Sequence, residues 1–321
     1  MKKMKRKIVV LFTLLLVVCA TNVKAQFDGM FTQYMFNEMF INPAYAGSKE
    51  AMSATLLHRQ QWIGFPGRPV TTSFSFHGPI VNGKMGLGIS FLNEKVGALN
   101  RNLLYGSYAY RLKTSATGTL ALGLMGGLDN QVNRFDQIKV TDAVGGAIDP
   151  NFSTNSMNLT GGNFGTGLYY STKSFYAGVS IPRMLDNQVK QSWNGSKTYM
   201  ITSLDAKLFT YYLTAGGVYK VNEDVRVKGT AMLKVVRNAP LSLDVTASAL
   251  IKETLWVGLA YRNRSALSLI LGAQVNKQLL VSYSYDYGLN SIQKYSSGSH
   301  EIGLNYLFSY KSYKAITPRY F

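Results

Sequence analysis

The chain has 321 residues, of which 46% are hydrophobic and only 16% charged. Soluble domains carry about 25% charged residues, so this chain is short of the groups that keep a surface in water. Its apolar and aromatic content excludes a disordered chain, and its single cysteine excludes a disulfide scaffold and a cysteine-based zinc site. The net charge of +18 would suit nucleic acid or an anionic surface, but part of it belongs to the N-terminus.

The chain opens with the pattern of a secretory signal peptide. Five of positions 2–7 are lysine or arginine, an apolar run follows over 8–20, and small residues end at Ala25. The run is too short for a membrane-spanning helix, which needs about 20 apolar residues. A lipoprotein signal using Cys19 is the alternative, but the bulky Val18 precedes that cysteine. We therefore predict that residues 1–25 are a signal peptide.

Removal of this signal changes the charge argument. Six of the 34 basic residues and none of the 16 acidic ones lie in the first 25 positions, so the remaining chain carries +12. Much of the basic excess is thus an export signal, and we expect no nucleic-acid partner.

Residues after the signal alternate repeatedly between apolar and polar side chains. Val225, Val227 and Leu233, for example, alternate with Arg226 and Lys234. Such a period of two predicts strands with one apolar and one polar face. We count fourteen such segments: 51–60, 70–77, 85–91, 101–112, 120–124, 164–170, 175–181, 209–220, 225–235, 241–249, 255–262, 266–275, 279–287 and 301–308.

Strand length and aromatic placement favour a membrane barrel over a soluble β-sandwich. Strands of about ten residues match a tilted bilayer crossing, whereas globular strands usually have about 5–6. Tyrosine and phenylalanine gather at strand ends, as in an interfacial girdle: Tyr108, Tyr110, Tyr169, Tyr170, Tyr287, Tyr306 and Phe308. The predicted fold is all-β, a transmembrane antiparallel β-barrel of about 14 strands over residues 51–308.

Connections between the strands alternate in length. Tight turns are expected near Gly83, Lys173, Glu223, Glu253 and Lys277, and longer loops between them. The predicted long loops are 93–100, 130–162, 182–208 and 289–299. Outer-membrane barrels place short turns in the periplasm, so we expect both termini there, with residues 26–50 as an N-terminal segment or plug and 309–321 as a tail. The contact residues of loops 130–162 and 182–208, and the oligomeric state, stay open.

Charged residues concentrate on the face that alternation assigns to the lumen. A lysine or arginine facing lipid at the midplane costs roughly 2–4 kcal/mol. The lumen could hold ions or a ligand, or its charges could brace the barrel; whether it is open is not decided. The predicted lumen charges are Arg226, Lys228, Lys234, Asp244, Arg262, Asp286 and Glu301.

Few residues could support catalysis. His58, His77 and His300 lie on different predicted strands, and no spacing suggests a triad or a metal site. The glycine-rich stretches precede no helix and are not phosphate loops. We predict that the protein is not an enzyme and has no cofactor or metal.

The last predicted strand has a separate feature. In 301–308, Gly303 is followed by Tyr306 and Phe308, an order that looks like the signal by which outer-membrane assembly machinery recognises a final strand. An edge strand with lipid-facing aromatics can be captured by strand addition. An ordinary amphipathic strand is the alternative.

Several blocks resemble the PorP/SprF family of Bacteroidota outer-membrane proteins, associated with the type IX secretion system and gliding motility. The resemblance spans nearly the whole chain after the signal. The blocks are 33–37 (QYMFN), 41–48 (INPAYAGS), 59–67 (RQQWIGFPG), 85–88 (MGLG), 283–287 (YSYDY) and 295–302 (YSSGSHEI).

This resemblance implies a partner protein for secretion in the outer membrane. Members hold secreted cargo, such as adhesins with a C-terminal sorting domain, at the cell surface, or link to periplasmic components of the machinery; outer-membrane lipid is the third partner. The candidate partner-binding residues are Tyr34, Asn42, Pro43 and Tyr45 in the N-terminal segment and Trp62 and Phe65 in the first outer loop. The segment could instead plug the lumen or tuck against the barrel floor, and the loop aromatics could be girdle residues. A passive channel for small solutes is the alternative function.

Overall fold

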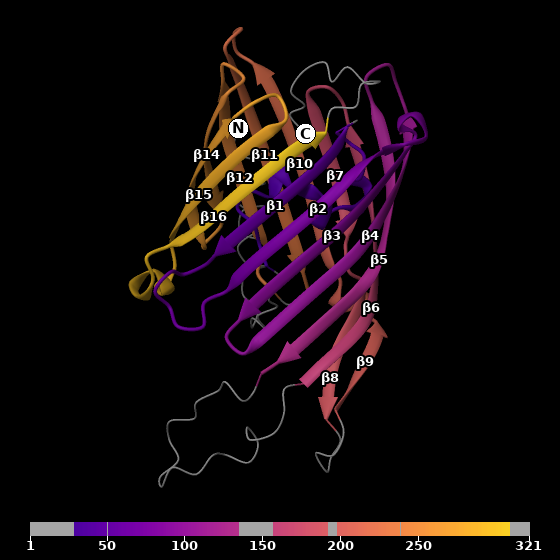
Figure 1. Cartoon of the computed structure of the whole chain (residues 1–321), viewed down its shortest axis with the longest axis vertical. Helices are drawn as coiled ribbons and strands as arrows, with labels where there is room; N and C mark the ends of the chain where they lie inside the picture. The colour runs from indigo at the N-terminus through magenta and orange to yellow at the C-terminus, as the bar shows by residue number, and fades with distance from the viewer. Residues whose placement is uncertain (1–28, 50, 135–156, 192–197, 238, 309–321) are drawn as a thin grey trace, which may run out of the picture.

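A computed structural model describes residues 29–49, 51–134, 157–191, 198–237 and 239–308 (Figure 1). The predicted signal peptide 1–25 and tail 309–321 lie outside these residues. No helix among them is long and apolar enough to cross a membrane.

Fourteen antiparallel strands form a closed barrel, as the alternation predicted (Figure 1). Each strand pairs with its neighbours in the chain, and β1 pairs with β16 to close the ring. The strands are β1 Met52–Gln60, β2 Val70–Ile80, β3 Met85–Val96, β4 Leu99–Lys113, β5 Thr119–Asn133, β6 Met157–Ser171, β7 Phe175–Ile181, β10 Thr210–Lys220, β11 Val225–Val236, β12 Ser242–Ile251, β13 Leu255–Arg262, β14 Ala266–Gln274, β15 Leu279–Gly288 and β16 Ser299–Phe308.

The two faces of the wall follow the predicted parity. In β13, Leu255, Val257 and Leu259 are exposed on the outside, while Trp256 and Ala260 are buried inside. An apolar surface that surrounds the whole molecule is stable only against lipid, because exposing so large an apolar area to water is unfavourable. The wall is therefore built for a bilayer.

The two ends of the barrel differ. The end that carries the tight turns after β2, β4, β6, β10, β12 and β14 is here called the turn end, and the opposite end the loop end. At the loop end, β3 and β4 are joined by Gly97 and Ala98 alone, so the long loop expected over 93–100 is wrong. These strands continue beyond the apolar band, where no lipid imposes alternation.

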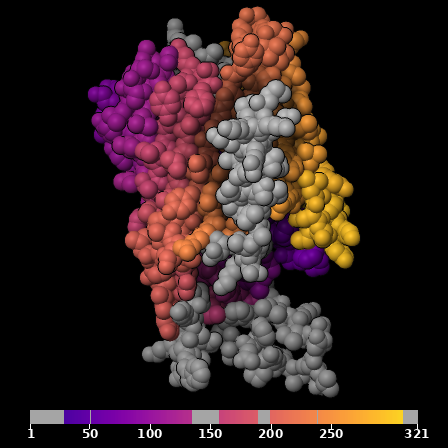
Figure 2. All heavy atoms as spheres, turned by 180° about the vertical axis from the view of Figure 1, so that it is seen from behind, coloured from indigo at the N-terminus to yellow at the C-terminus, as the bar shows by residue number. Residues whose placement is uncertain are grey.

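A separate hairpin lies at the loop end. Strands β8 (Leu185–Gln191) and β9 (Thr198–Leu204) pair only with each other, within the region expected as a loop over 182–208. The hairpin projects beyond the barrel wall next to β6 (Figures 1 and 2).

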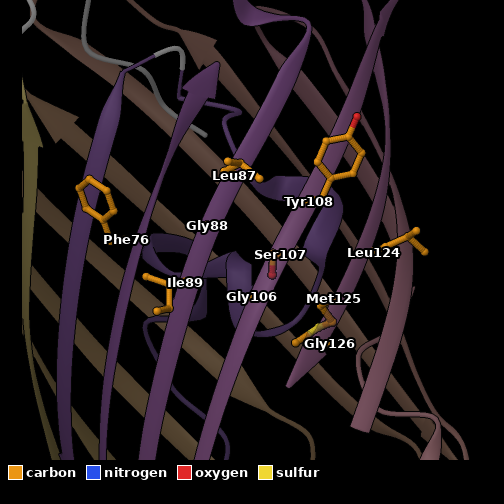
Figure 3. A pocket seen from close by; sticks show the side chains of 10 residues that line it. All are labelled: Phe76, Leu87, Gly88, Ile89, Gly106, Ser107, Tyr108, Leu124, Met125 and Gly126. Carbon is orange, nitrogen blue, oxygen red and sulfur yellow. The ribbon is translucent and has the colours of Figure 1, made fainter. Parts of the chain in front are cut away.

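The segment before β1 lies inside the barrel, not beside it (Figures 1 and 3). It contains three single-turn 3-10 helices, η1 (Tyr34–Phe36), η2 (Glu38–Phe40) and η3 (Pro43–Tyr45). We call residues 29–49 the plug. Its first described residue, Gly29, lies beside Glu94 and Thr71 in the loop-end half of the wall, and its last residues approach the turn end, where β1 begins. The termini themselves are not described, so their periplasmic location stays a prediction.

Candidate functional site: the plugged lumen and the loop-end rim

The plug is buried almost completely by the barrel. Met39, Ala44 and Ala46 have no exposed surface, and Tyr34 and Tyr45 have 2% or less. These residues pack against inward side chains from opposite sides of the wall in two clusters, and Phe31 of the plug packs in a third. Their burial removes apolar surface from a water-accessible lumen, which stabilises the plug by about 25 cal/mol per Å².

Charged residues of three strands bind the part of the plug nearer the loop end. Glu301 on β16 accepts the backbone N–H groups of Thr32 and Gln33, both at 2.9 Å. Arg59 on β1 lies 2.6 Å from Asp286 on β15 and 3.0 Å from Glu301. The Thr32 hydroxyl donates to Asp286 at 2.8 Å. Because all these groups are buried, the carboxylates need both the guanidinium and the plug to be satisfied.

Polar side chains of other strands bind the middle of the plug. Ser75 on β2 donates to the Asn37 carbonyl oxygen Oδ1 at 2.7 Å. On the far side of the lumen, the Tyr34 hydroxyl lies 3.0 Å from the Thr230 hydroxyl of β11. The plug therefore bridges opposite walls.

The NPAYAG block forms the part of the plug nearer the turn end. Asn42 caps η3 by accepting the Ala44 N–H at 3.0 Å, and its Nδ2 donates to the Leu168 carbonyl at 2.8 Å. His77 on β2 accepts the N–H of Gly47 at 3.1 Å through Nδ1. Pro43 at the first helical position suits η3, because its fixed φ favours a helix start.

Glycines in the wall let the backbone of this block approach. A β-carbon at Gly86 would overlap the Ala46 carbonyl, and one at Gly123 would overlap the backbone of Ala44. The Met-Gly-Leu-Gly block singled out in the sequence is thus a contact surface for the plug: Gly86 meets Ala46, and Gly88 meets the Met39 side chain.

Glu38 is the one carboxylate of the described plug, and it is fully inside the barrel. Burial raises the pKa of Glu38 to about 7, while the nearby Lys228 ammonium, the Tyr176 and Tyr169 side chains and the Lys49 ammonium oppose the shift. Burial also lowers the pKa of Lys49 to about 8. The centre of the lumen is therefore a place where charge is costly.

Six of the predicted lumen charges are buried inside the barrel: Lys228, Lys234, Asp244, Arg262, Asp286 and Glu301. Asp244 accepts from Arg262 at 2.6 Å, and the Lys234 ammonium lies 5.8 Å from the centre of the Tyr212 ring. Arg226 differs, because it lies at the turn end and pairs with Glu253 at 2.6 Å in the turn between β12 and β13.

Trp62 and Phe65 lie together in the loop between β1 and β2. Their rings meet edge to face with centroids 6.4 Å apart, and Phe65 is 36% exposed. Backbone hydrogen bonds join this loop to the one before β16: Ile63 N–H donates to Gly298 at 2.8 Å, and Ser297 N–H donates to Ile63 at 2.8 Å. Two blocks far apart in sequence thus build one side of the loop-end rim.

The four plug residues named as partner-binding candidates lie away from this rim. Tyr34, Asn42, Pro43 and Tyr45 are buried in the lumen, while Trp62 and Phe65 are at the rim. The structure does not bring the two groups together.

The residues of the proposed assembly signal occupy both faces of β16. Gly303 faces inward against Leu57 and Gln33, whereas Phe308 is 42% exposed on the outside and packs edge to face with Phe76 at 5.9 Å. Tyr306 packs against Phe308 at 4.8 Å.

The prediction that Tyr169 belongs to the interfacial aromatic girdle is wrong. It is 1% exposed and lies inside the barrel, stacked on Tyr176 at 5.5 Å and edge to face with Tyr45 at 5.5 Å. Its neighbour Tyr170 takes the outward parity, because successive side chains of a strand point to opposite faces. Position near a strand end did not decide which face it occupies.

A hollow of about 560 Å³ marks the outer wall between β2 and β5 (Figure 3). Leu87, Ile89, Tyr108 and Leu124 border it, and glycines form part of its floor. It lies within the apolar outer face, so acyl chains would fill it.

Sequence reasoning predicted Asp286 and Glu301 as lumen charges but not their contacts with the plug. Arg59 and Gln33 were named only within family blocks, and Thr32 and Glu38 were not singled out, although an arginine at an inward position of β1 was a usable signal. Within the described residues, no group of three or more histidine, cysteine, aspartate or glutamate side chains could hold a metal ion.

A family model described as type IX secretion system membrane protein PorP/SprF matches residues 23–306. The chain belongs to this family. The sequence resemblance is thereby confirmed, and family and fold together support an outer-membrane location. The PorP/SprF family is one of secretion proteins, and no curated protein matches this chain.

Solved barrels resemble the chain only distantly. The CymD monoaromatic hydrocarbon channel has a TM-score of 0.48 and 12% identity over 90% of this chain and 95% of its own. The Ralstonia pickettii toluene transporter TbuX has 0.46 and 10% over 91% and 97%. The KdgM porin has 0.39 and 11% over 80% and 99%. These similarities show the barrel fold alone, and the substrates of these channels are not assigned to this PorP/SprF protein.

Proposed function

We propose that this PorP/SprF protein is an outer-membrane accessory component of type IX secretion that docks or anchors secreted cargo at the cell surface. The cargo would be held through its C-terminal sorting domain by the loop-end rim, without chemistry and without a cofactor. Residues 1–25 would export the chain, both termini would be periplasmic, and the turn end would face the periplasmic components of the machinery.

The plug is the observation that carries this proposal. A diffusion channel needs a lumen that water and solutes can cross, whereas here residues 31–47 fill the barrel and join opposite walls. Replacing the buried contacts of Arg59 and Glu301 with water would leave charges without their partners. A lumen so filled supports binding at the rim over passage through the barrel.

Exposed groups at the loop end could supply the binding surface. Phe65 and Tyr295 are 36% and 71% exposed, and the backbone bonds between their loops fix them on one side of the rim. Aromatic side chains held on a rigid support are favoured anchors for protein partners.

Affinity capture tests the proposal. The tagged full chain, solubilised from the outer membrane, is expected to retain a secreted protein that carries a C-terminal sorting domain, identified by mass. Phe65→Ala is expected to weaken capture by roughly tenfold, the scale of a lost aromatic anchor. Tyr219→Ala, at the turn end and 73% exposed, is the matched control and should leave capture unchanged. Recovery of no secreted protein by the wild-type chain would contradict docking.

A further inference from the structure

One strand of the closed barrel has an edge that its neighbour leaves open. β6 has 15 residues and β7 only 7. They pair from Thr166 to Ser171, while β5 pairs with β6 along its whole length. After Ile181 the chain leaves the wall for the β8–β9 hairpin, so the loop-end half of β6 has a strand on one side only.

Backbone groups on this open edge are partly taken by the hairpin. The Phe164 carbonyl accepts the Met184 N–H at 2.9 Å, and the Gly162 carbonyl accepts the Asn187 Nδ2 at 3.1 Å. Because alternate residues of a strand direct their N–H and C=O groups to the same side, Thr160 and Asn158 also face away from β5. No described residue bonds their backbone on that side.

A row of hydrogen-bonded amides places this edge outside the lipid. On the outer face, Asn93 donates to Asn102 at 2.8 Å, Asn102 to Asn130 at 3.2 Å, and Asn130 to Thr160 at 2.9 Å. The row crosses β3, β4, β5 and β6, where the apolar side chains nearer the middle of these strands give way to amides. It ends at the open edge, with the Thr160 and Asn158 side chains exposed.

The inner side of the same edge is built for a polypeptide and not for lipid. Asn187 and Met200 of the hairpin cover β6 at Gly161. A polar cavity of about 210 Å³ opens next to the edge, lined by residues that include Asp129, Asn163 and Asn187. An added strand would therefore meet amides on one face and the hairpin on the other.

We propose that the edge of β6 at Asn158–Gly162 binds an extended segment of a secreted polypeptide as an additional strand. Main-chain hydrogen bonds to Thr160 and Asn158 would give affinity, as in other strand additions. Amide or hydroxyl side chains of the segment would continue the asparagine row and give specificity. The proposal rests on the docking function, for which it supplies the site.

A proline at position 160 tests the edge selectively. The Thr160 N–H points away from β5, so Thr160→Pro removes an edge donor and no backbone hydrogen bond of the barrel, and prolines are tolerated on such edges. It also removes the hydroxyl that accepts from Asn130, as Thr160→Ala does. Thr160→Ala keeps the N–H and is the matched control. A photoreactive phenylalanine analogue is placed at position 158 of the full-length chain, with Thr160 intact or with either substitution. Each protein is irradiated in cells that secrete the natural cargo proteins.

The expected result is an adduct between position 158 and an extended segment of a secreted protein. Thr160→Pro should lower its yield by about tenfold, as expected when an edge hydrogen bond is lost and its partner left unpaired, and Thr160→Ala by less than about twofold. Unchanged heat-modifiable migration of both variants would show that the barrel folds.

Other outcomes overturn the proposal. An adduct with a second copy of this chain or with another part of the same chain would assign the edge to that occupant. An adduct yield unaffected by Thr160→Pro would exclude strand addition. If affinity capture succeeds with Phe65 intact but position 158 gives no adduct, docking stands and the edge does not; if capture also fails, the docking function itself is wrong.

Discussion

Glu301, on the last strand of the barrel, accepts the backbone N–H of Thr32 at 2.9 Å across 269 residues of sequence. It thereby joins closure of the barrel to occupation of its lumen. The same carboxylate pairs with Arg59 on the first strand, which β16 must meet to close the ring. Plug and wall therefore form one folded unit.

Removal of Arg59 should destabilise that unit strongly. Arg59→Gln leaves Asp286 and Glu301 buried without their cation, which costs about 3 kcal/mol or more. We expect the folded band on a semi-native gel to convert to the unfolded one at a clearly lower temperature.

Arg226→Gln is the control for this change. Its partner Glu253 is half exposed at the turn end, and exposed pairs contribute about 1 kcal/mol or less. Equal effects of the two substitutions would contradict the role given to Arg59.

A side chain at Gly123 should displace the plug. Gly123→Leu would overlap the Ala44 backbone, and forced overpacking costs about 1–3 kcal/mol. A cysteine in place of Ala44 should then react with a water-soluble maleimide at least about tenfold faster, following the population of the displaced state. Gly229→Leu, at an outward position with no atom nearby, is the control. Equal labelling rates would show that Gly123 is not a plug contact.

The stability of the barrel should fall between pH 4.5 and pH 7. Glu38 has its pKa raised to about 7 by burial, so in this range the folded chain holds a proton that the unfolded chain has released. Stability is then fully present below pH 4.5 and decreases as pH rises to 7, by about 3 kcal/mol on this account. The conversion temperature measured across this range tests it.

Glu38→Gln should remove this pH dependence, because an amide does not titrate. Lys49, with its pKa lowered to about 8, acts in the opposite sense above pH 8, where stability should rise. A slope between pH 4.5 and 7 that persists in Glu38→Gln would assign it to other groups.

Loss of Phe308 should reduce the amount of folded barrel in the outer membrane. Phe308→Ala removes an outward ring of the last strand, which packs on Phe76 and Tyr306. Phe175→Ala removes a comparable ring, 45% exposed, from β7 and is the control. If both variants reach the same outer-membrane level, β16 has no special role in assembly.

The wall could be predicted from sequence because lipid imposes a strict rule on it. Every second residue of a spanning strand must be apolar, and this period located all fourteen strands. Where the rule ends, prediction ended too: residues 93–100 are polar because β3 and β4 pass beyond the lipid, not because they form a loop.

The plug and its partners could not be predicted in the same way. Three single-turn helices have no period to detect. The inward charges followed from the cost of facing lipid, but pairing Arg59 with Asp286 and Glu301 requires strand register and ring closure, which alternation does not contain. Tyr169 shows the same limit, since its face depends on the parity of β6.

Ion conductance of the purified full-length protein in a planar bilayer tests most directly whether the barrel binds with a sealed lumen. The account predicts no steady conductance for the wild-type chain and open-channel events for Gly123→Leu, in which the plug loses its seat against the wall. A steady, porin-like conductance of the wild-type chain, unchanged in Gly123→Leu, would contradict it.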